Sequence, residues 1–345
     1  MDLNEYNFYE NINRYGIRPE VISLLPEKPR QIEAYYDDGY ILRYDGFNLA
    51  LWVHRGREAG LARQLQILQL LMQQGLESLL YPLPLSDGRT YAELNQFCWF
   101  YVTPWPVMQE VRFKSITDLR AIVNLVADFR KVLHQKGFLF CLAERRNNAN
   151  LVEKFREILR QLNSFAMLAK HRLRPTAFDH QFLLYLPQFL EQAETALEII
   201  KNTVYQDLIN NLTPCDIIIN NLTRHNLRMT DDGGIVCLRL DDYRWDLAII
   251  DLAILLTKSG RSCHWEDGWF QMILHEYERH FPISVTERQI IHSYLVFPWS
   301  FYRLASRYYY NRVEWPLRTF MEKMKRVVED EGNRAGFLKN NKLIF

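Results

Sequence analysis

Apolar and polar positions alternate in the first third of the chain, as they do in half-buried β-strands. Three such runs lie between residues 30 and 55, and an Asp-Gly pair separates each from the next, at 38–39 and at 45–46. Asp-Gly is a strong signal for a tight turn between antiparallel strands. A fourth run, 97–102, stops at the Thr-Pro-Trp-Pro sequence that begins at Thr103. The pattern predicts a small β-rich lobe over residues 1–105.

One segment of this lobe has helical spacing instead. Leu61, Leu65, Leu68 and Met72 recur every three or four residues before Gly75. This period places the four side chains on one face of a helix, and glycine commonly follows a helix end. We therefore expect one helix in the lobe. Its first acid, Glu58, is expected to be solvated and favoured there by the helix dipole.

Residues 106–345 are predicted to form a larger, mainly helical lobe, so the fold class is α+β with two lobes. Ser115 and Asp118 have the spacing of a helix cap, and an apolar stripe follows them as far as Gly137. Further helical patterns cover 150–171, 180–210, the region near Glu266, the region near Thr286 with Gln289 as a capping box, and 315–331.

The stretch from Cys215 to Leu256 has a different organisation. Two β-branched runs flank Asp232-Gly233-Gly234, which predicts a hairpin. The whole order is loop, strand, turn, strand, loop and helix start. It resembles the catalytic and metal-binding loops of kinase-like phosphotransferases. That resemblance implies a protein-kinase-like fold of the aminoglycoside-phosphotransferase type.

On this resemblance, the positions that carry catalytic groups in active enzymes hold other residues here. Ile219 stands at the usual His, Asn221 at the base Asp, Asn226 at the metal-binding Asn, and Arg239 at the metal Asp. Asp241 retains the second acid of the usual I-D-x-D run.

Two further aspartates bear on this alignment. Asp251 is retained before the next helix, where the resemblance implies that it anchors the loop of Asn221 through backbone hydrogen bonds. Asp216 lies five residues before Asn221, which matches a D-x-x-x-x-N spacing in another register. That register fills the catalytic loop with three isoleucines and lengthens the hairpin, so it is the less favoured of the two.

These replacements remove the chemistry of phosphoryl transfer. Mg²⁺ requires oxygen ligands, and the permanently charged Arg239 offers none. At about 4 Å and an effective dielectric of about 20, the guanidinium would repel a divalent ion by roughly 8 kcal/mol. Asn221 cannot accept a substrate proton, and loss of a positioned base costs roughly 10²- to 10⁴-fold in rate.

The lysine that grips nucleotide phosphates in kinases is also missing. Residues 30–113 contain no lysine and no G-x-G-x-x-G motif. Depending on the strand register, the lysine position holds Trp52 or Arg43. An arginine there could still contact a phosphate, whereas a tryptophan could not.

Most of the chain resembles the CotS family of endospore coat proteins, which is related to aminoglycoside and choline kinases. The likeness rests on 240–252, 126–138, 296–315 and Gly336–Leu338. It implies a structural protein of the bacterial spore coat that is made in the mother-cell cytoplasm. Other spore coat proteins would then be its partners.

Charge and hydropathy argue against several other classes. Lys and Arg total 42 against 41 Asp and Glu, a formal charge of +1, which gives no support for a nucleic-acid partner. The polar N-terminus lacks the apolar run of a secretory signal, and no segment approaches the roughly 20 apolar residues that span a bilayer. We expect no membrane span.

An acidic group at Asp241, Asp242 and Asp246 is a candidate cation site. Arg239 and Arg244 lie beside it in the sequence. We therefore expect ion pairs there and no bound metal.

Aromatic residues make up 14% of the chain and are concentrated near its C-terminal end. Phe301, Leu304 and Tyr308 share one helix face, which indicates core packing. Tyr309 and Tyr310 point elsewhere, so a secondary hypothesis gives them contacts with other proteins. Replacing both with Ala should then weaken assembly without unfolding the monomer.

The leading interpretation is a catalytically inactive, pseudokinase-like structural protein of the spore coat, with no cofactor. Two alternatives remain open. One is an active small-molecule phosphotransferase that recruits Asp241 for Mg²⁺ and Arg43 for phosphate. The other is a module that binds a nucleotide or another ligand without turnover.

Overall fold

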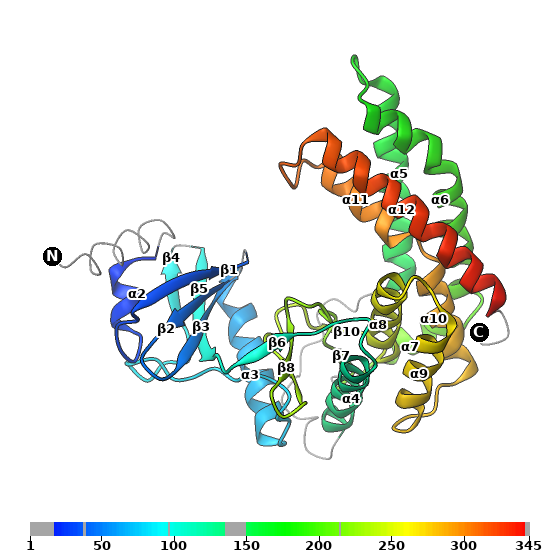
Figure 1. The fold of residues 1–345 in the computed structure, drawn as a ribbon. Coiled ribbons are helices and arrows are strands. Elements are labelled where there is room, and N and C mark those ends of the chain that lie inside the picture. Colours follow the sequence, from blue (N-terminus) through cyan, green and yellow to red (C-terminus); the bar gives the residue numbers. More distant parts are fainter. Residues whose placement is uncertain (1–16, 37–38, 96, 135–149, 214, 342–345) are drawn as a thin grey trace. The chain divides into compact units, whose positions relative to one another are not determined.

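The computed structural model describes residues 17–36, 39–95, 97–134, 150–213 and 215–341 (Figure 1). They form two compact units. The first is drawn from residues 1–111 and 223–242, and the second from 112–222 and 243–345. The first unit is built on β-sheets and the second on helices, which confirms the α+β class. The predicted lobe boundary near residue 105 stays a prediction. The sequence did not indicate that residues 223–242 belong to the same unit as the sheet.

A five-stranded antiparallel sheet forms the first unit, in the order β1-β2-β3-β5-β4. Its strands are β1 (Gln31–Tyr35), β2 (Gly39–Arg43), β3 (Asn48–Arg55), β4 (Ala92–Asn95) and β5 (Cys98–Pro104). The three predicted runs and the last strand are confirmed, whereas β4 was not predicted. At the second predicted turn Gly46 has φ +85°, a conformation that favours glycine. Asp38, in the first predicted turn, lies outside the described residues.

The two faces of this sheet differ in what they pack against. Leu49, Leu51 and Val53 of β3 join one apolar cluster with the short helix α2 (Pro19–Ser23). Because side chains alternate along a strand, Trp52 lies on the opposite face.

Helix α3 (Glu58–Gln73) is the one predicted in this unit. It buries Leu61, Leu65 and Leu68 as expected, but Met72 is 49% exposed. Ile67 and Leu71, which were not predicted, are also buried. Eleven residues at about 100° each bring Met72 back to within about 20° of Leu61, so the helical period does not explain its exposure. Met72 lies in the last turn of the helix.

The predicted hairpin is confirmed as β8 (Leu227–Thr230) and β9 (Ile235–Cys237). Gly233 in its turn has φ +82°. A third strand, β6 (Met108–Glu110), pairs with β8 in antiparallel fashion. This pairing joins the hairpin to the end of the first chain segment of the same unit.

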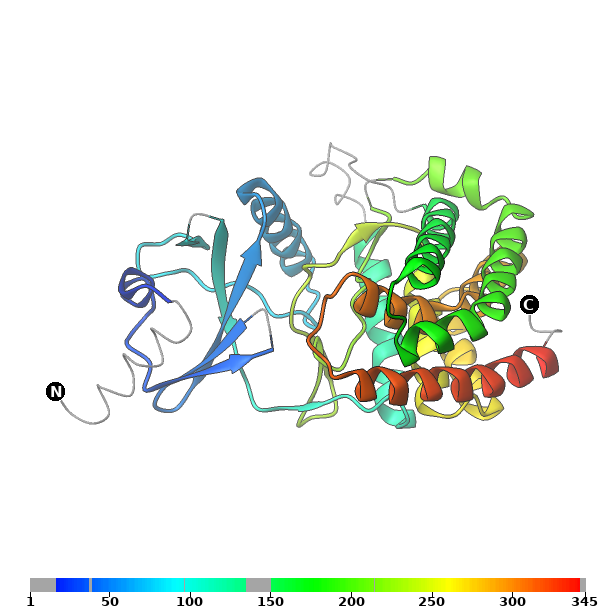
Figure 2. The same ribbon diagram turned by 90° about the horizontal axis from the view of Figure 1, so that it is seen from above.

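The second unit is a bundle of helices that also contains the short strand pair β7 (Ile217–Ile218) and β10 (Arg244–Trp245) (Figure 2). Its helices are α4 (Ile116–Leu133), α5 (Leu151–His171), α6 (Ala177–Lys201), α7 (Tyr205–Asn210), α8 (Ile249–Ser262), α9 (Asp267–Glu278), α10 (Val285–Val296), α11 (Trp299–Tyr309) and α12 (Leu317–Asn340). In both views α5 and α6 run side by side.

The structure corrects several predicted helix ends. The Ser115 hydroxyl accepts from the Asp118 amide, so that cap is confirmed, while Gly137 lies outside the described residues. The capping box of α10 is formed by Ser284 and Glu287, because Ser284 has the extended backbone of an N-cap and Thr286 is already helical. The helix predicted over 180–210 is divided into α6 and α7, and α12 continues to Asn340.

Tyr309 is half-buried and packs against the core, so the prediction that it points away from the packed face is wrong. Its ring stacks on Phe165 with the ring centres 5.0 Å apart, and its hydroxyl donates to Asp179 at 3.0 Å. Asp179 is fully buried. Because a helix presents three or four residues to its neighbours in each turn, the apolar face of α11 extends to Tyr309. Tyr310 is 45% exposed and remains available for the hypothesis.

Candidate functional site

Arg239 follows β9 by two residues and is held between an acid and an aromatic ring. One guanidinium nitrogen, Nη1, lies 3.1 Å from Oδ2 of Asp241. The guanidinium carbon lies 4.8 Å from the centre of the Trp52 ring, within the range of a cation–π contact. Only 11% of the side chain is exposed. The charge at this position therefore points into the unit and not toward solvent.

Asp241 is surrounded by donors. Its Oδ1 accepts from Gln64 Nε2 at 2.6 Å and from the Tyr101 hydroxyl at 3.2 Å, while Oδ2 faces Arg239. Although the residue as a whole is exposed, only 26% of its side-chain surface is accessible. Burial raises the pKa of Asp241, and Arg239 opposes this rise. Both carboxylate oxygens thus have partners within the protein.

The two candidates for the missing lysine lie in different surroundings. Trp52 is buried on β3, in contact with Arg239, and its Nε1 donates to Thr103 Oγ1 at 3.0 Å. Arg43 lies on β2 and pairs with Glu33 at 2.8 Å. The structure therefore brings Trp52, and not Arg43, to the guanidinium of Arg239.

The ring of Trp52 also explains a glycine on the neighbouring strand. Gly39 pairs with Trp52 across β2 and β3, and a Cβ atom at Gly39 would lie 2.7 Å from the indole. Only glycine admits this close approach.

Asn226 ties the start of β8 to the loop after β9. Its Oδ1 accepts from the Arg239 amide at 2.9 Å, and its Nδ2 donates to the Arg239 carbonyl at 2.9 Å and to Cys237 Sγ at 3.3 Å. The side chain is buried. The amide of Asn226 thus fixes the backbone of Arg239 from both sides.

In the second unit, Asp251 holds the loop that contains Asn221. Its two oxygens accept from the amides of Ile219 and Asn220, each at 2.8 Å. Asn220 has φ +60°, so the loop turns sharply at this point. Burial raises the pKa of Asp251 to about 6, although the two amides lower it. The side chain of Asn221 is half-buried.

Asp216 stabilises its own turn and lies 3.6 Å from Nε2 of His134. Its Oδ2 accepts from the amide and the hydroxyl of Thr213, at 2.5 and 2.7 Å. Such an Asp–Thr pair closes a turn. The register that makes Asp216 a base gains no support from these contacts.

The expected ion pairs of the acidic group are confirmed. Arg239 pairs with Asp241, and Arg244 Nη2 lies 2.9 Å from Asp246 Oδ2. Burial raises the pKa of Asp246 to about 6, against the opposing effect of Arg244. Within the described ranges, no three His, Cys, Asp or Glu side chains converge as a metal site would require.

Gln64 and Tyr101 are the two site residues that sequence reasoning missed. Gln64 interrupts the apolar face of α3, and it is 2% exposed. A polar side chain on a buried helix face must find a hydrogen-bond partner, and this was the available signal. Glu58, by contrast, is exposed and accepts from the Tyr91 hydroxyl.

Solved structures with a similar fold are phosphotransferases and kinases. A crystal structure of an aminoglycoside phosphotransferase from Alicyclobacillus acidocaldarius subsp. acidocaldarius matches with a TM-score of 0.79 and 16% identity, covering 95% of this chain and 96% of that one. Spectinomycin phosphotransferase APH(9)-Ia, bound to AMP, matches with a TM-score of 0.66 and 13% identity over 90% and 96% of the two chains. Amicoumacin kinase hAmiN, in complex with AMP-PNP, Ca²⁺ and Ami, matches with 0.60 and 13% over 96% of each.

These matches show that the chain has the kinase-like fold of aminoglycoside phosphotransferases, as the resemblance implied. A comparison with curated proteins found no match. No helix in the described part of the chain is long and apolar enough to cross a membrane. A family model described as "Spore coat putative kinase YutH" matches residues 47–341. The chain therefore belongs to this spore coat family of kinase-like proteins, which confirms the resemblance to CotS-type coat proteins.

Proposed function

We propose that this protein is a catalytically inactive, kinase-like structural component of the spore coat. The observation that carries the proposal is the pair of Arg239 and Asp241. On the alignment proposed from the sequence, Arg239 holds the position of the metal aspartate, and it pairs with the neighbouring carboxylate of Asp241. Mg²⁺ would have to displace a charge of its own sign from that carboxylate.

The surroundings of the pair support the same conclusion. Gln64 and Tyr101 hydrogen-bond to the other oxygen of Asp241, so a metal ion would gain this ligand only by breaking several contacts. Trp52, one of the two candidates for the lysine position, carries no charge for a phosphate, and its ring is in contact with the guanidinium of Arg239. An active enzyme that recruits Asp241 and Arg43 would have to break one ion pair at each residue before both could act.

Membership of the spore coat family supports the remaining part of the proposal. On this basis the protein is made in the mother-cell cytoplasm and reaches the coat through contacts with other coat proteins. The absence of phosphoryl transfer leaves the fold free to serve as a scaffold, because fold and activity are separable.

Thermal unfolding with ATP, with and without Mg²⁺, tests the inactive state. We expect no saturable rise of the melting temperature in either condition and no phosphate release. A Mg²⁺-dependent rise accompanied by phosphate transfer would establish an active enzyme. A saturable, metal-independent rise would establish a nucleotide-binding module instead.

Two substitutions examine whether the arginine itself excludes the metal. Arg239→Asp places a second carboxylate beside Asp241, so Mg²⁺ should raise the melting temperature of this variant. Arg239→Asn removes the cation without adding a ligand and serves as the matched control. If Mg²⁺ affects neither variant, the loss of metal binding has another origin.

Incorporation into spores tests the structural role. Because Tyr310 is exposed and Tyr309 is not, Tyr310→Ala alone is the variant that probes a surface contact. We expect less of this variant in purified coats at an unchanged melting temperature. Incorporation at the normal level would show that Tyr310 does not contribute to assembly.

A further inference from the structure

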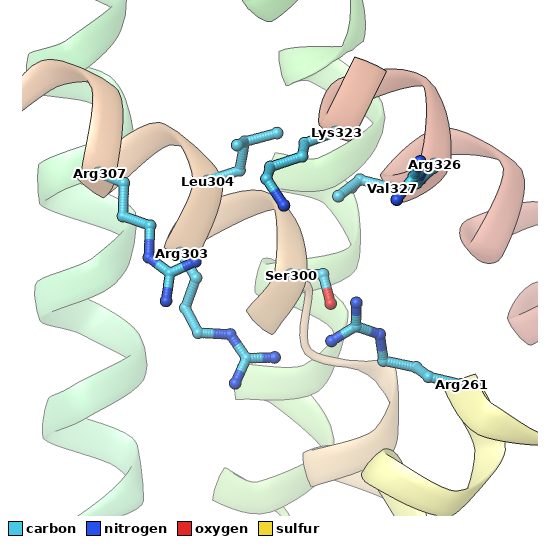
Figure 3. Close-up of a pocket in the computed structure, with 8 residues that line it drawn as sticks. All are labelled: Arg261, Ser300, Arg303, Leu304, Arg307, Lys323, Arg326 and Val327. Atoms are coloured by element: carbon cyan, nitrogen blue, oxygen red, sulfur yellow. The ribbon is translucent and has the colours of Figure 1, made fainter. Parts of the chain in front are cut away.

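A basic pocket of about 350 Å³ lies in the second unit, between α8, α11 and α12. Five cationic side chains line it: Arg261 from α8, Arg303 and Arg307 from α11, and Lys323 and Arg326 from α12. Figure 3 shows the guanidinium groups of Arg261 and Arg303 on either side of the Ser300 hydroxyl, with the Lys323 amine directed toward the same space. Three helices thus bring positive charge to one cavity.

Helical spacing explains how the cations gather. Ser300, Arg303 and Arg307 are three or four residues apart and share one face of α11, and Lys323 and Arg326 do so on α12. Like charges at i and i+4, such as Arg303 and Arg307, destabilise a helix. The arrangement is therefore costly unless something compensates it.

Acidic side chains do not supply this compensation. Arg261 lies 3.5 Å from Asp330, but within the part of the chain that the structure describes no carboxylate forms an ion pair with Arg303, Arg307, Lys323 or Arg326. Arg307 and Lys323 lie over the Trp315 ring, a weaker partner than an anion.

The pKa values in this region reflect the same excess of positive charge. Partial desolvation of the guanidinium lowers the pKa of Arg303, although the residue as a whole is exposed, and the neighbouring Arg261 and Arg307 lower it further. Burial, Arg303 and Arg261 also lower the pKa of Lys258 on α8 to about 8. An anion in the pocket would oppose the effect of the neighbouring cations on Arg303.

We propose that this pocket binds a small anion that carries two or more phosphate groups. Arginine forks match phosphate oxygens in pairs, and several uncompensated cations require a multivalent partner. The volume suits a small molecule. Leu304 and Val327 add only a narrow apolar strip, so the recognition is electrostatic. The proposal does not depend on the state of the phosphotransfer site, since none of these residues belongs to it.

Calorimetric titration of the full chain with pyrophosphate, at constant ionic strength, tests the proposal. We expect saturable binding of one pyrophosphate per chain and weaker binding of inorganic phosphate. Arg303→Gln should raise the Kd at least tenfold. The matched control is Arg318→Gln, because Arg318 lies on α12 but is 89% exposed and paired with Glu322. This control should leave the Kd unchanged.

Other outcomes would overturn the proposal. Equal weakening by Arg303→Gln and Arg318→Gln would indicate general charge attraction. If citrate binds as tightly as pyrophosphate, the pocket recognises polyanions in general and not phosphate groups. If the unmodified chain does not bind pyrophosphate, the proposed site does not exist. Arg303→Gln relieves repulsion, so its melting temperature without ligand should equal or exceed that of the unmodified protein, which separates lost binding from lost folding.

Discussion

Arg239 is a buried cation held in a closed contact within the first unit. A buried guanidinium is costly unless it is paired and hydrogen-bonded. Here it has the carboxylate of Asp241 on one side and the Trp52 ring on the other. Asp241 in turn needs Arg239, because Gln64 and Tyr101 supply hydrogen bonds but no charge. Arg239 and Asp241 therefore each depend on the other to compensate a buried charge.

This dependence predicts the effect of removing the cation. Arg239→Gln should lower the free energy of unfolding by about 2 kcal/mol, less than the roughly 3–5 kcal/mol typical of a fully buried pair because Asp241 keeps some solvent access. Urea unfolding of the purified protein measures the change.

A double-mutant cycle supplies the control for that measurement. Adding Asp241→Asn to Arg239→Gln removes both charges, so the double variant should be more stable than the sum of the single effects implies. If the two effects add, the pair contributes no coupling and the explanation of Arg239 fails.

At the scale of elements, α8 shows how tightly the helical unit is packed. Gly260 lies in this helix, and a Cβ atom there would be 2.6 Å from the Trp265 ring. Trp265 is buried and donates to Asp330, so the indole cannot move away easily.

The packing predicts opposite effects of the same substitution in two helices. Gly260→Ala should lower the free energy of unfolding by about 1–3 kcal/mol through overpacking. Gly332→Ala in α12, where no atom lies within 4 Å of the added Cβ, should raise it by about 0.5–1 kcal/mol because alanine favours helix. Denaturant midpoints of both variants measure these shifts. If Gly260→Ala instead stabilises the protein, the Trp265 side chain must be able to move away from the added methyl group despite its hydrogen bond to Asp330.

At the scale of the whole molecule, two buried carboxyls connect stability to pH. The folded-state pKa values of Asp246 and Asp251 are about 6, against an ordinary value of 3.8. The folded protein therefore binds protons more tightly than the unfolded chain between these pH values. The stability contributed by these groups is fully present below about pH 4 and is lost as the pH rises through about 6.

Variants isolate this contribution from the rest of the molecule. Between about pH 4 and 7, the free energy of unfolding of the unmodified protein should fall relative to that of Asp246→Asn and of Asp251→Asn, by about 1–3 kcal/mol for each. Carboxyls with lowered pKa values act in the opposite direction, but they are common to all three proteins and cancel in the difference. A difference that is constant with pH would contradict the assignment.

The overall charge of the molecule conceals its distribution. A formal charge of +1 gave no indication of an anionic partner, yet five cations line one pocket of the second unit. Net charge is a sum over the chain, whereas binding depends on which charges the fold brings together.

Local patterns along the chain determine much of this protein by themselves. Alternating runs and Asp-Gly turns predicted three strands, the hairpin at 227–237 followed from glycines between β-branched runs, and the Ser115 cap followed from its spacing. The neighbouring charges Arg239 and Asp241 also predicted their own ion pair. In each case the interacting groups are close in sequence, so the chain itself holds them together.

Only the tertiary structure decided which distant residues complete these features. Gln64, Tyr101 and Trp52 reach the Arg239–Asp241 pair from three other elements. Tyr309 packs on Phe165 and donates a hydrogen bond to Asp179, and these two residues lie on two other helices. Such contacts depend on how helices and strands pack, and packing depends on the shapes of all their side chains at once. A one-dimensional pattern records the spacing along each element and not its neighbours.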